Sequence, residues 1–376
     1  MAGKKRQPDS VDLKWMDRAL DLAELGRYTV SPNPMVGAVL VRAGRLIGEA
    51  FHRRAGGPHA EAAALARAGS RARGADLYVT LEPCAHFGRT PPCSDAIVEA
   101  GVSRVIVGSR DPHPLVRGRG LRRLSKAGVK VLSADAARRR RAEEQNEKFR
   151  IWADERRPFV LAKWGASLDG RIATFRGESR WITGTAARSR GLLLREEYDA
   201  VLVGAGTVLA DDPRLTRRLG RNTTTPWRIV LDGRLQVPEG ARVFREPGNR
   251  VVLTALPESH PRARRLARRG VEVWSFPSRR QGRVDLRRAA AAMARRVITS
   301  VLVEGGARTL GSFFDPGLVD RVAVFIAPRI LGGGAALAAV GGRGFTLATS
   351  PRLKGVEIER IGADWLVTGR VIRSPD

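Results

Sequence analysis

The chain has 376 residues, a formal net charge of +29 at pH 7 and two cysteines. This length suggests two domains, and no run of about 18 apolar residues exists to form a membrane-spanning helix. Two cysteines are too few for the disulfide framework of a small secreted domain.

The basic excess is compatible with nucleic-acid partners or with small anionic substrates. Arginine accounts for 59 of the 67 basic residues, and the arginines are spread along the whole chain. Aromatic residues make up only 6% of the sequence, and no recognition helix or stacking motif stands out. We therefore expect an enzyme with an anionic small-molecule substrate, without a nucleic-acid or membrane partner.

Residues 1–10 are polar and basic, which predicts a flexible tail and not a secretory signal. An amphipathic helix is expected over 11–26, and paired strands over 36–41 and 46–51. Helices near His59, Cys93 and residue 121 then alternate with strands near 77–81, 104–108 and 129–132. This alternation predicts an α/β sandwich with a mixed sheet, and reduced cysteines without an export signal suggest the cytoplasm.

Two stretches carry the residue types of a metal site. The first is Gly57-Pro58-His59-Ala60-Glu61, and the second is Thr80-Leu81-Glu82-Pro83-Cys84, followed after eight residues by Cys93. One imidazole and two thiols supply three ligands for one Zn²⁺ per chain and leave a fourth position for water. Glu61 is then a carboxylate that binds no metal and moves protons, which completes the residue set of a zinc-dependent deaminase.

The helix positions support this interpretation. Residues two apart on a helix do not share a face, so His59 and Glu61 converge only if a helix begins there, and Pro58 suits such a start. Cys93 opens the next helix, where the dipole favours a thiolate. Glu61 would take a proton from the metal-activated water and pass it to the leaving ammonia.

Other residues of the first half leave two readings open. Asn33, within Ser31-Pro32-Asn33-Pro34, has the groups to read a pyrimidine edge, but it is also an ordinary turn residue. His52 and His86 are either neighbours of the metal or structural residues.

Charged residues dominate 136–157, which predicts a solvated helix between two domains and a boundary near residue 150. The resulting domains cover 11–150 and 151–376. In the second, a largely parallel sheet with an antiparallel C-terminal edge is expected. Its predicted strands lie near 159–164, 199–204, 228–232, 250–254, 271–275, 300–304, 319–326, 356–360 and 365–371, and its helices near 185–197, 261–269, 284–296 and 306–315.

Two glycine turns of the second half suit a phosphorylated cofactor. Gly204-Ala205-Gly206 and Gly305-Gly306 each follow an apolar strand and lead into a helix, where backbone N–H groups can bind a phosphate. Such turns are also common punctuation between strands and helices. The first lacks the third glycine of a dinucleotide fingerprint, since Leu209 occupies that position.

The chain resembles the bifunctional riboflavin-biosynthesis deaminase–reductase family over nearly its whole length. Besides the two metal motifs, the matching segments are Pro32-Asn33-Pro34, Gly88-Arg89-Thr90-Pro91-Pro92-Cys93, Gly165-Ala166-Ser167-Leu168-Asp169-Gly170, Gly177-Glu178-Ser179, Trp181-Ile182-Thr183, Thr207-Val208-Leu209-Ala210-Asp211-Asp212-Pro213 and Val303-Glu304-Gly305-Gly306. The resemblance implies a cytidine-deaminase-like α/β/α sandwich followed by a dihydrofolate-reductase-like α/β domain, with Zn²⁺ and NADPH as cofactors. We also expect a homo-oligomer.

Two reactions are implied by this resemblance. The first domain would use a zinc-bound hydroxide to deaminate a diaminopyrimidinone that carries a ribosylamino phosphate. The second would use NADPH to reduce the ribosyl group to ribityl. His59, Cys84 and Cys93 would bind zinc, and Glu61 would shuttle protons.

The resemblance also assigns the remaining contacts. The reductase substrate would contact Ser179, Arg195, Leu215, Arg218 and Glu304. NADPH would contact Gly165, Trp181, Thr207, Asp211, Gly305, Gly306, Ala307, Arg308, Thr309, Leu310 and Gly311. Asp211 is a candidate for the proton donor of the reductase.

Three rival hypotheses compete with this reading. A deaminase acting on nucleic acid would explain the charge but leaves the second domain without a role. A zinc-stabilised binding module would need a fourth protein ligand, and only three are evident. A dehydrogenase of the dinucleotide-binding type acting on another substrate would explain only residues 158–376.

Overall fold

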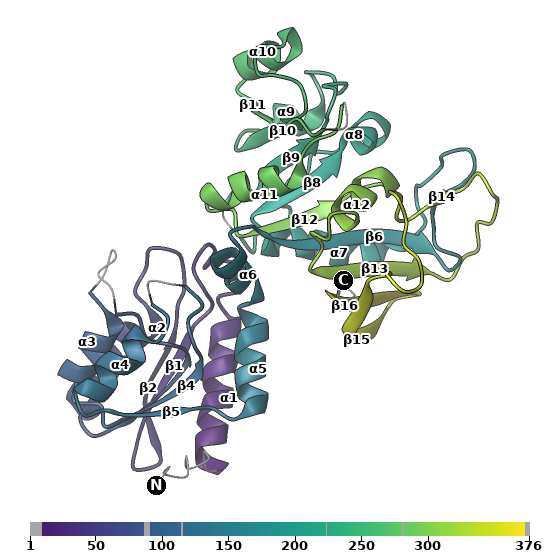
Figure 1. The fold of residues 1–376 in the computed structure, drawn as a ribbon. Coiled ribbons are helices and arrows are strands. Elements are labelled where there is room, and N and C mark those ends of the chain that lie inside the picture. The colour runs from purple at the N-terminus through teal and green to yellow at the C-terminus, as the bar shows by residue number, and fades with distance from the viewer. Residues whose placement is uncertain (1–9, 86–90, 114–115, 223, 280–281, 373–376) are drawn as a thin grey trace. The chain divides into compact units, whose positions relative to one another are not determined.

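The computed structural model describes residues 10–85, 91–113, 116–222, 224–279 and 282–372. The chain divides into two compact units, residues 1–156 and 157–376 (Figure 1). The predicted tail lies outside the described residues except for Ser10, where the first helix begins.

The first unit alternates helices and strands as the sequence predicts. Its elements are α1 Ser10–Glu24, β1 Gly37–Arg42, β2 Arg45–Phe51, α2 Ala60–Ala68, the 3₁₀ turn η1 Gly69–Ala72, β3 Asp76–Leu81, α3 Cys93–Glu99, β4 Arg104–Ser109, α4 Arg119–Lys126, β5 Lys130–Ser133, α5 Ala136–Gln145 and α6 Glu147–Glu155.

These elements form three layers around a five-stranded sheet of order β2-β1-β3-β4-β5. β1 is antiparallel to β2 and β3, whereas β3, β4 and β5 are parallel, so the predicted mixed sheet is confirmed. Apolar residues of α2, α3 and α4 pack on one face, and those of α1 and α5 pack on the other. β2 and β3 run in the same direction because both are antiparallel to β1, so α2 and α3, which follow them, start at the same edge of the sheet. This arrangement positions the metal motifs.

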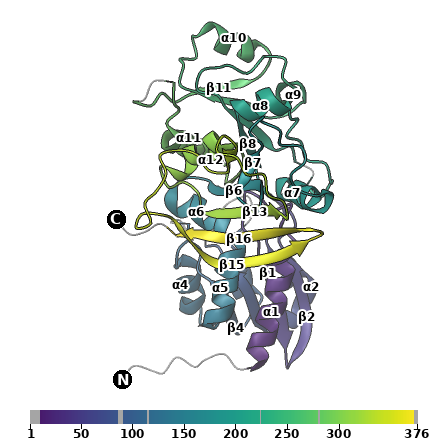
Figure 2. The same ribbon diagram turned by 90° about the vertical axis from the view of Figure 1, so that its right-hand side faces the viewer.

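The charged segment after β5 differs from the single solvated helix that the sequence predicts. It forms two helices, α5 and α6, separated by the buried Asn146. α5 lies beside α1 (Figures 1 and 2). Arg138 and Arg141 form ion pairs with Asp17 and Asp21 of α1. The arginine run is therefore an ionic contact between two helices of the first unit, which extends to residue 156.

The second unit is larger. Its elements are β6 Phe159–Ser167, β7 Arg171–Ala173, α7 Thr185–Glu197, β8 Ala200–Gly204, α8 Ala205–Asp211, β9 Trp227–Leu231, α9 Arg242–Arg245, β10 Arg250–Thr254, α10 Pro261–Arg268, β11 Glu272–Ser275, α11 Leu286–Arg295, β12 Ser300–Glu304, α12 Ala307–Phe314, β13 Arg321–Ala327, β14 Leu337–Ala338, β15 Arg352–Ile361 and β16 Asp364–Ile372. The sequence analysis did not predict β7, α9 or β14 as elements.

Nine strands form one sheet in the order β11-β10-β9-β8-β12-β6-β13-β16-β15. The strands from β11 to β13 are parallel, and β16 and β15 add an antiparallel edge, as predicted. Apolar residues of α11 and α12 cover one face of the central strands. Glu304 of β12 and Lys163 of β6 are register partners whose side chains lie on the opposite face.

Candidate active sites

The three predicted metal ligands converge in the first unit. The ligand atoms of His59, Cys84 and Cys93 all lie within 4.8 Å of one another. His59 Nδ1 is 3.2 Å from the Cys93 thiol and 3.6 Å from the Cys84 thiol. His59 is the N-cap of α2 and Cys93 the first residue of α3, so two helix starts and the end of β3 build the cluster.

The electrostatics of this cluster fit a divalent cation. The pKa of the Cys84 thiol is lowered to about 4, chiefly because the Cys93 thiol donates to its sulfur. The same contact raises the pKa of Cys93, since its ionisation would place a second negative charge beside the first. A bound Zn²⁺ removes this conflict and stabilises both thiolates. One imidazole and two thiolates are ligands that zinc prefers, so the residues fit the metal.

Glu61 lies beside the cluster but is not one of its ligand residues. Its side chain is almost completely buried, on the inner face of α2 with Ala60, Ala64 and Leu65. Burial raises the pKa of Glu61 to about 7. A carboxyl group with this pKa can accept and release a proton near neutrality, which is what a proton shuttle requires.

Glu82 of the second metal motif has a structural role. Its carboxylate accepts N–H bonds from Gly118, Gly120 and Leu121 at the start of α4, and from Asp111. A side chain at Gly120 would lie only 1.9 Å from the Pro83 carbonyl oxygen, so only glycine allows this approach. Glu82 thus fixes the segment that leads to Cys84.

Asn33 and His52 form a hydrogen-bonded pair near the metal ligands. His52 Nδ1 is 2.9 Å from the Pro58 carbonyl oxygen, which can only accept, so Nδ1 carries the proton. In the neutral ring, Nε2 then accepts from Asn33 Nδ2 at 3.0 Å. Burial lowers the pKa of His52, which favours this neutral form. Asn33 Oδ1 has no partner among the described residues and is available to accept from a ligand.

Two sequence predictions lie in a part of the chain without a structural description. His86 and the segment Gly88-Arg89-Thr90 fall within residues 86–90, outside the described residues.

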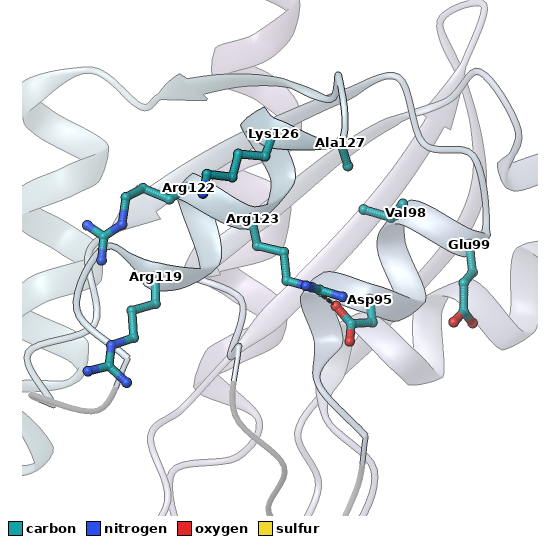
Figure 3. A pocket seen from close by; sticks show the side chains of 8 residues that line it. All are labelled: Asp95, Val98, Glu99, Arg119, Arg122, Arg123, Lys126 and Ala127. Atoms are coloured by element: carbon teal, nitrogen blue, oxygen red, sulfur yellow. Dashed lines mark hydrogen bonds and ion pairs between the residues drawn. The ribbon is translucent and has the colours of Figure 1, made fainter.

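A groove of about 570 Å³ lies between α3 and α4 (Figure 3). Its lining is Asp95, Val98, Glu99, Arg119, Arg122, Arg123, Lys126 and Ala127. Arg123 pairs with Asp95 across the groove. The lining includes no metal ligand and no predicted site residue, so the groove is separate from the deaminase site.

In the second unit, Glu304 and Arg195 form a bidentate ion pair, with N–O distances of 2.7 and 2.8 Å. Lys163 Nζ lies 3.9 Å from the same carboxylate. Burial acts to raise the pKa of Glu304, but the charges of Arg195 and Lys163 outweigh it and lower the pKa to about 2. The sequence analysis missed Lys163, although a lysine within an otherwise apolar central strand was an available signal.

The remaining predicted substrate residues are placed differently. Leu215 is buried, whereas Arg218 is exposed. Glu196, which follows Arg195, accepts from the backbone N–H groups of Arg218 and Leu219 and thereby holds their loop beside α7. Ser179 is half-buried in the segment between β7 and α7. Arg195 and Glu304 are thus brought together, whereas no hydrogen bond between the described residues links Ser179 to either of them.

The two glycine turns lie side by side because β8 and β12 are neighbouring parallel strands. A side chain at Gly204 would lie 2.0 Å from Thr309 Oγ1, and one at Gly305 would lie 2.7 Å from Thr309 Cβ. Gly206 faces open space, and a side chain at Gly306 would meet only Thr207 Oγ1, at 3.9 Å. Two helix starts with open space beside Gly206 and Gly306 therefore lie side by side and form a cradle, and helix starts of this kind suit the phosphates of a dinucleotide.

The other predicted cofactor residues lie on separate elements. Trp181 is 61% exposed, with the Arg188 guanidinium 4.4 Å from its ring centroid. A side chain at Gly165 would meet Thr183. Asp211, at the end of α8, is ion-paired with Arg180 at 2.8 Å.

Within the segment Gly305–Gly311, only part can reach a ligand through side chains. Thr309 and Leu310 are buried, and Leu310 belongs to the apolar core. A side chain at Gly311 would collide with the backbone of Gly341. Leu310 and Gly311 therefore pack the helix against the protein, and a contact of either residue with NADPH stays a prediction that would have to involve the backbone.

Two family models divide the chain in the same way as its structure. The zinc-binding region of cytidine and deoxycytidylate deaminases matches residues 9–109, and the RibD C-terminal domain matches residues 158–367. Fold and site thus define a bifunctional enzyme, in which a zinc-dependent deaminase precedes an NADPH-dependent reductase.

Full-length relatives narrow the family further. The chain is 40% identical over 361 residues to the riboflavin biosynthesis protein RibD of Aquifex aeolicus, covering 95% of this chain and 98% of the relative. RibD of Acinetobacter baumannii has a similar structure, with a TM-score of 0.85, 36% identity and coverage of 96% and 99%. The chain belongs to the RibD family of riboflavin-biosynthesis enzymes.

The name of a third relative states both activities. It is the Thermotoga maritima diaminohydroxyphosphoribosylaminopyrimidine deaminase/5-amino-6-(5-phosphoribosylamino)uracil reductase, with a TM-score of 0.82, 37% identity and coverage of 96% and 99%. The predicted fold class and the predicted pair of activities are confirmed by these matches. Among the described residues, no helix is long and apolar enough to cross a membrane.

Proposed function

We propose that the first unit deaminates a diaminopyrimidinone carrying a ribosylamino phosphate, and that the second reduces the ribosyl group of the deaminated product with NADPH. The single observation that carries the first assignment is the buried, non-ligating Glu61 beside His59, Cys84 and Cys93. The description of the Thermotoga maritima relative supports this choice of substrates. We assign the two activities to residues 11–156 and 157–376.

In the deaminase site, each residue has a distinct role. His59, Cys84 and Cys93 would hold Zn²⁺, which would lower the pKa of a water molecule so that it could act as a nucleophile near neutral pH. Glu61 accepts the proton that this water loses and returns it to the departing amine. Asn33 Oδ1 accepts an N–H of the pyrimidine, since its Nδ2 is committed to His52.

In the reductase site, charged residues bind the phosphorylated substrate. Glu304 accepts hydrogen bonds from ribose hydroxyls while Arg195 holds its carboxylate in place. Arg218 contributes a charge near Glu304 and is exposed, so it can meet the phosphate. The glycine turns at the starts of α8 and α12 would hold NADPH, which would supply the hydride. Asp211 is paired with Arg180, so we assign proton donation to Lys163, whose ammonium lies beside Glu304.

We further propose that the chain forms a homo-oligomer through β15. This edge strand is exposed along nearly its full length, and Leu353, Val356 and Ile358 are 40%, 49% and 69% exposed. Pairing with a second copy would cover these apolar side chains and the open edge of the sheet. A cytoplasmic location follows from the need to keep Cys84 and Cys93 reduced for metal binding.

Mass spectrometry of the purified, zinc-loaded protein incubated with the diaminopyrimidinone phosphate tests the assignment. Without NADPH, we expect one product, in which an amine is replaced by oxygen. With NADPH, we expect a second product that carries two additional hydrogens. An unchanged substrate under both conditions, with zinc bound, would refute the proposal.

A further inference from the structure

Asn146 separates α5 from α6 and is 3% exposed. Its side chain forms two hydrogen bonds with the backbone of a single distant residue. Asn146 Oδ1 accepts from Met35 N at 2.7 Å, and Asn146 Nδ2 donates to the Met35 carbonyl oxygen at 2.9 Å. The amide thus pairs with Met35 as the backbone of a neighbouring strand would.

A helix-capping role does not account for this side chain. Asparagine at a helix start usually caps the helix with its side-chain oxygen. Asn146 is the N-cap residue of α6, yet it makes no side-chain cap hydrogen bond. The oxygen that would cap the helix is used for Met35 instead.

The segment held in this way carries Asn33. Pro32 and Pro34 have no backbone N–H, so this stretch has few ways to tie itself to the protein. Asn33 N donates to the Val30 carbonyl oxygen. After Met35, the Val36 carbonyl oxygen accepts from His52 N at 2.9 Å, and Gly37 N donates to Thr80 Oγ1. The pair of bonds to Asn146 therefore restrains Met35 itself, which lies between the turn at Asn33 and the anchored start of β1.

Asn33 needs such a restraint for its proposed role. His52 accepts from Asn33 Nδ2, so Asn33 Oδ1 is the end of the amide that points away from the ring. It does not fix the position of the backbone from which that amide projects. Met35 is two residues from Asn33, so holding the Met35 backbone limits where Asn33 Oδ1 can lie.

We propose that Asn146 is a positioning residue of the deaminase site, which holds the Asn33 segment in the conformation that binds the pyrimidine. This inference rests on the proposed substrate and on the proposed role of Asn33. It connects the deaminase site to the junction of α5 and α6, in the charged segment that precedes the second unit.

The inference predicts a specific kinetic effect. If the segment samples several conformations without Asn146, only a fraction of the protein is competent to bind, and the apparent affinity falls by that fraction. Once bound, the substrate selects the competent conformation, and the metal ligands and Glu61 are unchanged. KM for deamination should therefore rise while kcat stays near the wild-type value.

Two variants of Asn146 and one control test this. Asn146→Ala should raise KM for deamination by about tenfold or more, with kcat within about twofold of wild type, if the competent fraction falls to about a tenth. Asn146→Asp keeps an acceptor for Met35 N but loses the donor to the Met35 carbonyl. Its KM should therefore lie between the KM of the wild type and that of Asn146→Ala. Gln145→Ala is the matched control, because Gln145 contacts Leu20 and Glu24 of α1 and not the Asn33 segment.

Hydrogen exchange provides a readout that does not depend on the substrate. The Met35 amide should exchange faster in Asn146→Ala and Asn146→Asp than in wild type or Gln145→Ala, with zinc content unchanged. An unchanged KM and unchanged exchange in both Asn146 variants would overturn the inference. The inference would also be overturned if kcat fell in parallel with the melting temperature while KM stayed constant, because that result is expected of a residue that only stabilises the fold. If exchange of the Met35 amide depends on Asn146 as expected, but the wild-type protein does not turn over the diaminopyrimidinone phosphate, the proposed function is refuted instead.

Discussion

At the scale of single residues, the metal cluster depends on each ligand. Cys84→Ser should lose zinc and deamination together, because a serine hydroxyl is far harder to ionise than a thiol and leaves two ligands. Metal analysis should find about one zinc per wild-type chain and much less in the variant. Reduction of an already deaminated substrate should continue. A variant with a full complement of zinc would contradict the ligand assignment.

The Glu304 carboxylate gives the second unit a dependence on pH. Its folded-state pKa of about 2 lies below the ordinary value of 4.5, so its ionisation stabilises the fold above pH 4.5. This contribution is lost as the pH falls from about 4.5 toward 2, at about 1.4 kcal/mol per unit. The difference in unfolding free energy between wild type and Glu304→Gln should therefore shrink by about 2 kcal/mol between pH 6 and pH 3. Denaturant unfolding of both proteins across this range measures it, and a constant difference would argue against the ion pair.

Residue types and spacing predicted the metal ligands and Glu61, because zinc chemistry needs those groups in those motifs. Lys163 and Asn146 were not predicted, for a different reason. Lys163 meets Glu304 only through the register of β6 and β12, and Asn146 meets Met35 across 111 positions of sequence. Contacts that depend on strand register or on a distant loop leave no local pattern to recognise.

At the scale of elements, the cradle between α8 and α12 contains glycines with two roles, one that leaves space for a ligand and one that allows close packing. Gly306→Ala should change the unfolding free energy by no more than about 0.5 kcal/mol, since its side chain would meet nothing closer than 3.9 Å. It should nevertheless raise KM for NADPH by about tenfold, equivalent to about 1.4 kcal/mol, because the methyl group obstructs the helix start.

Gly305→Ala is the contrasting variant, because its side chain would collide with Thr309 at 2.7 Å. We expect it to lower stability as well as cofactor affinity. Thermal unfolding together with NADPH titration distinguishes the two variants. If Gly306→Ala bound NADPH like the wild type, the cradle would not be the cofactor site.

The β15–β16 hairpin should control assembly. Ile358→Glu places a charge on the exposed edge strand, which should oppose pairing with a second copy and yield a smaller particle. Leu347→Glu is a matched control, because Leu347 is 94% exposed but lies outside the hairpin. Light scattering after size-exclusion chromatography measures the masses. Equal masses for Ile358→Glu and wild type would exclude this edge as the interface.

The long elements were predictable because their apolar residues repeat with the period of a helix or a strand. β7, α9 and β14 have only two to four residues, which is too short for a period to show. The prediction of a single solvated helix over residues 136–157 was wrong for a different reason. Its arginines indicated a solvated helix, yet Arg138 and Arg141 bind the acidic residues of α1, and Ala142 is buried. Charge alone does not distinguish a solvated face from an ionic contact between helices.

At the scale of the whole molecule, the two activities belong to separate compact units. The described residues that we assign to each site come from one unit. Glu61, His59, Cys84 and Cys93 lie before residue 156, whereas Lys163, Arg195 and Glu304 lie after it. Each unit also has its own sheet and its own apolar core. Single substitutions should therefore separate the two reactions.

Glu61→Gln keeps the shape of the side chain but cannot accept a proton from water. Deamination should fall by about 10²–10⁴-fold, the usual contribution of general acid–base catalysis, while zinc stays bound because its three ligands are intact. Given already deaminated substrate and NADPH, the variant should reduce it near the wild-type rate. Arg195→Ala should show the reverse, releasing ammonia normally and reducing slowly, because its Glu304 partner is left buried without its main counter-charge. Ammonia release and NADPH oxidation, measured separately, test both variants. If Glu61→Gln stopped both reactions in folded, zinc-bound protein, the assignment of one reaction to each unit would be wrong.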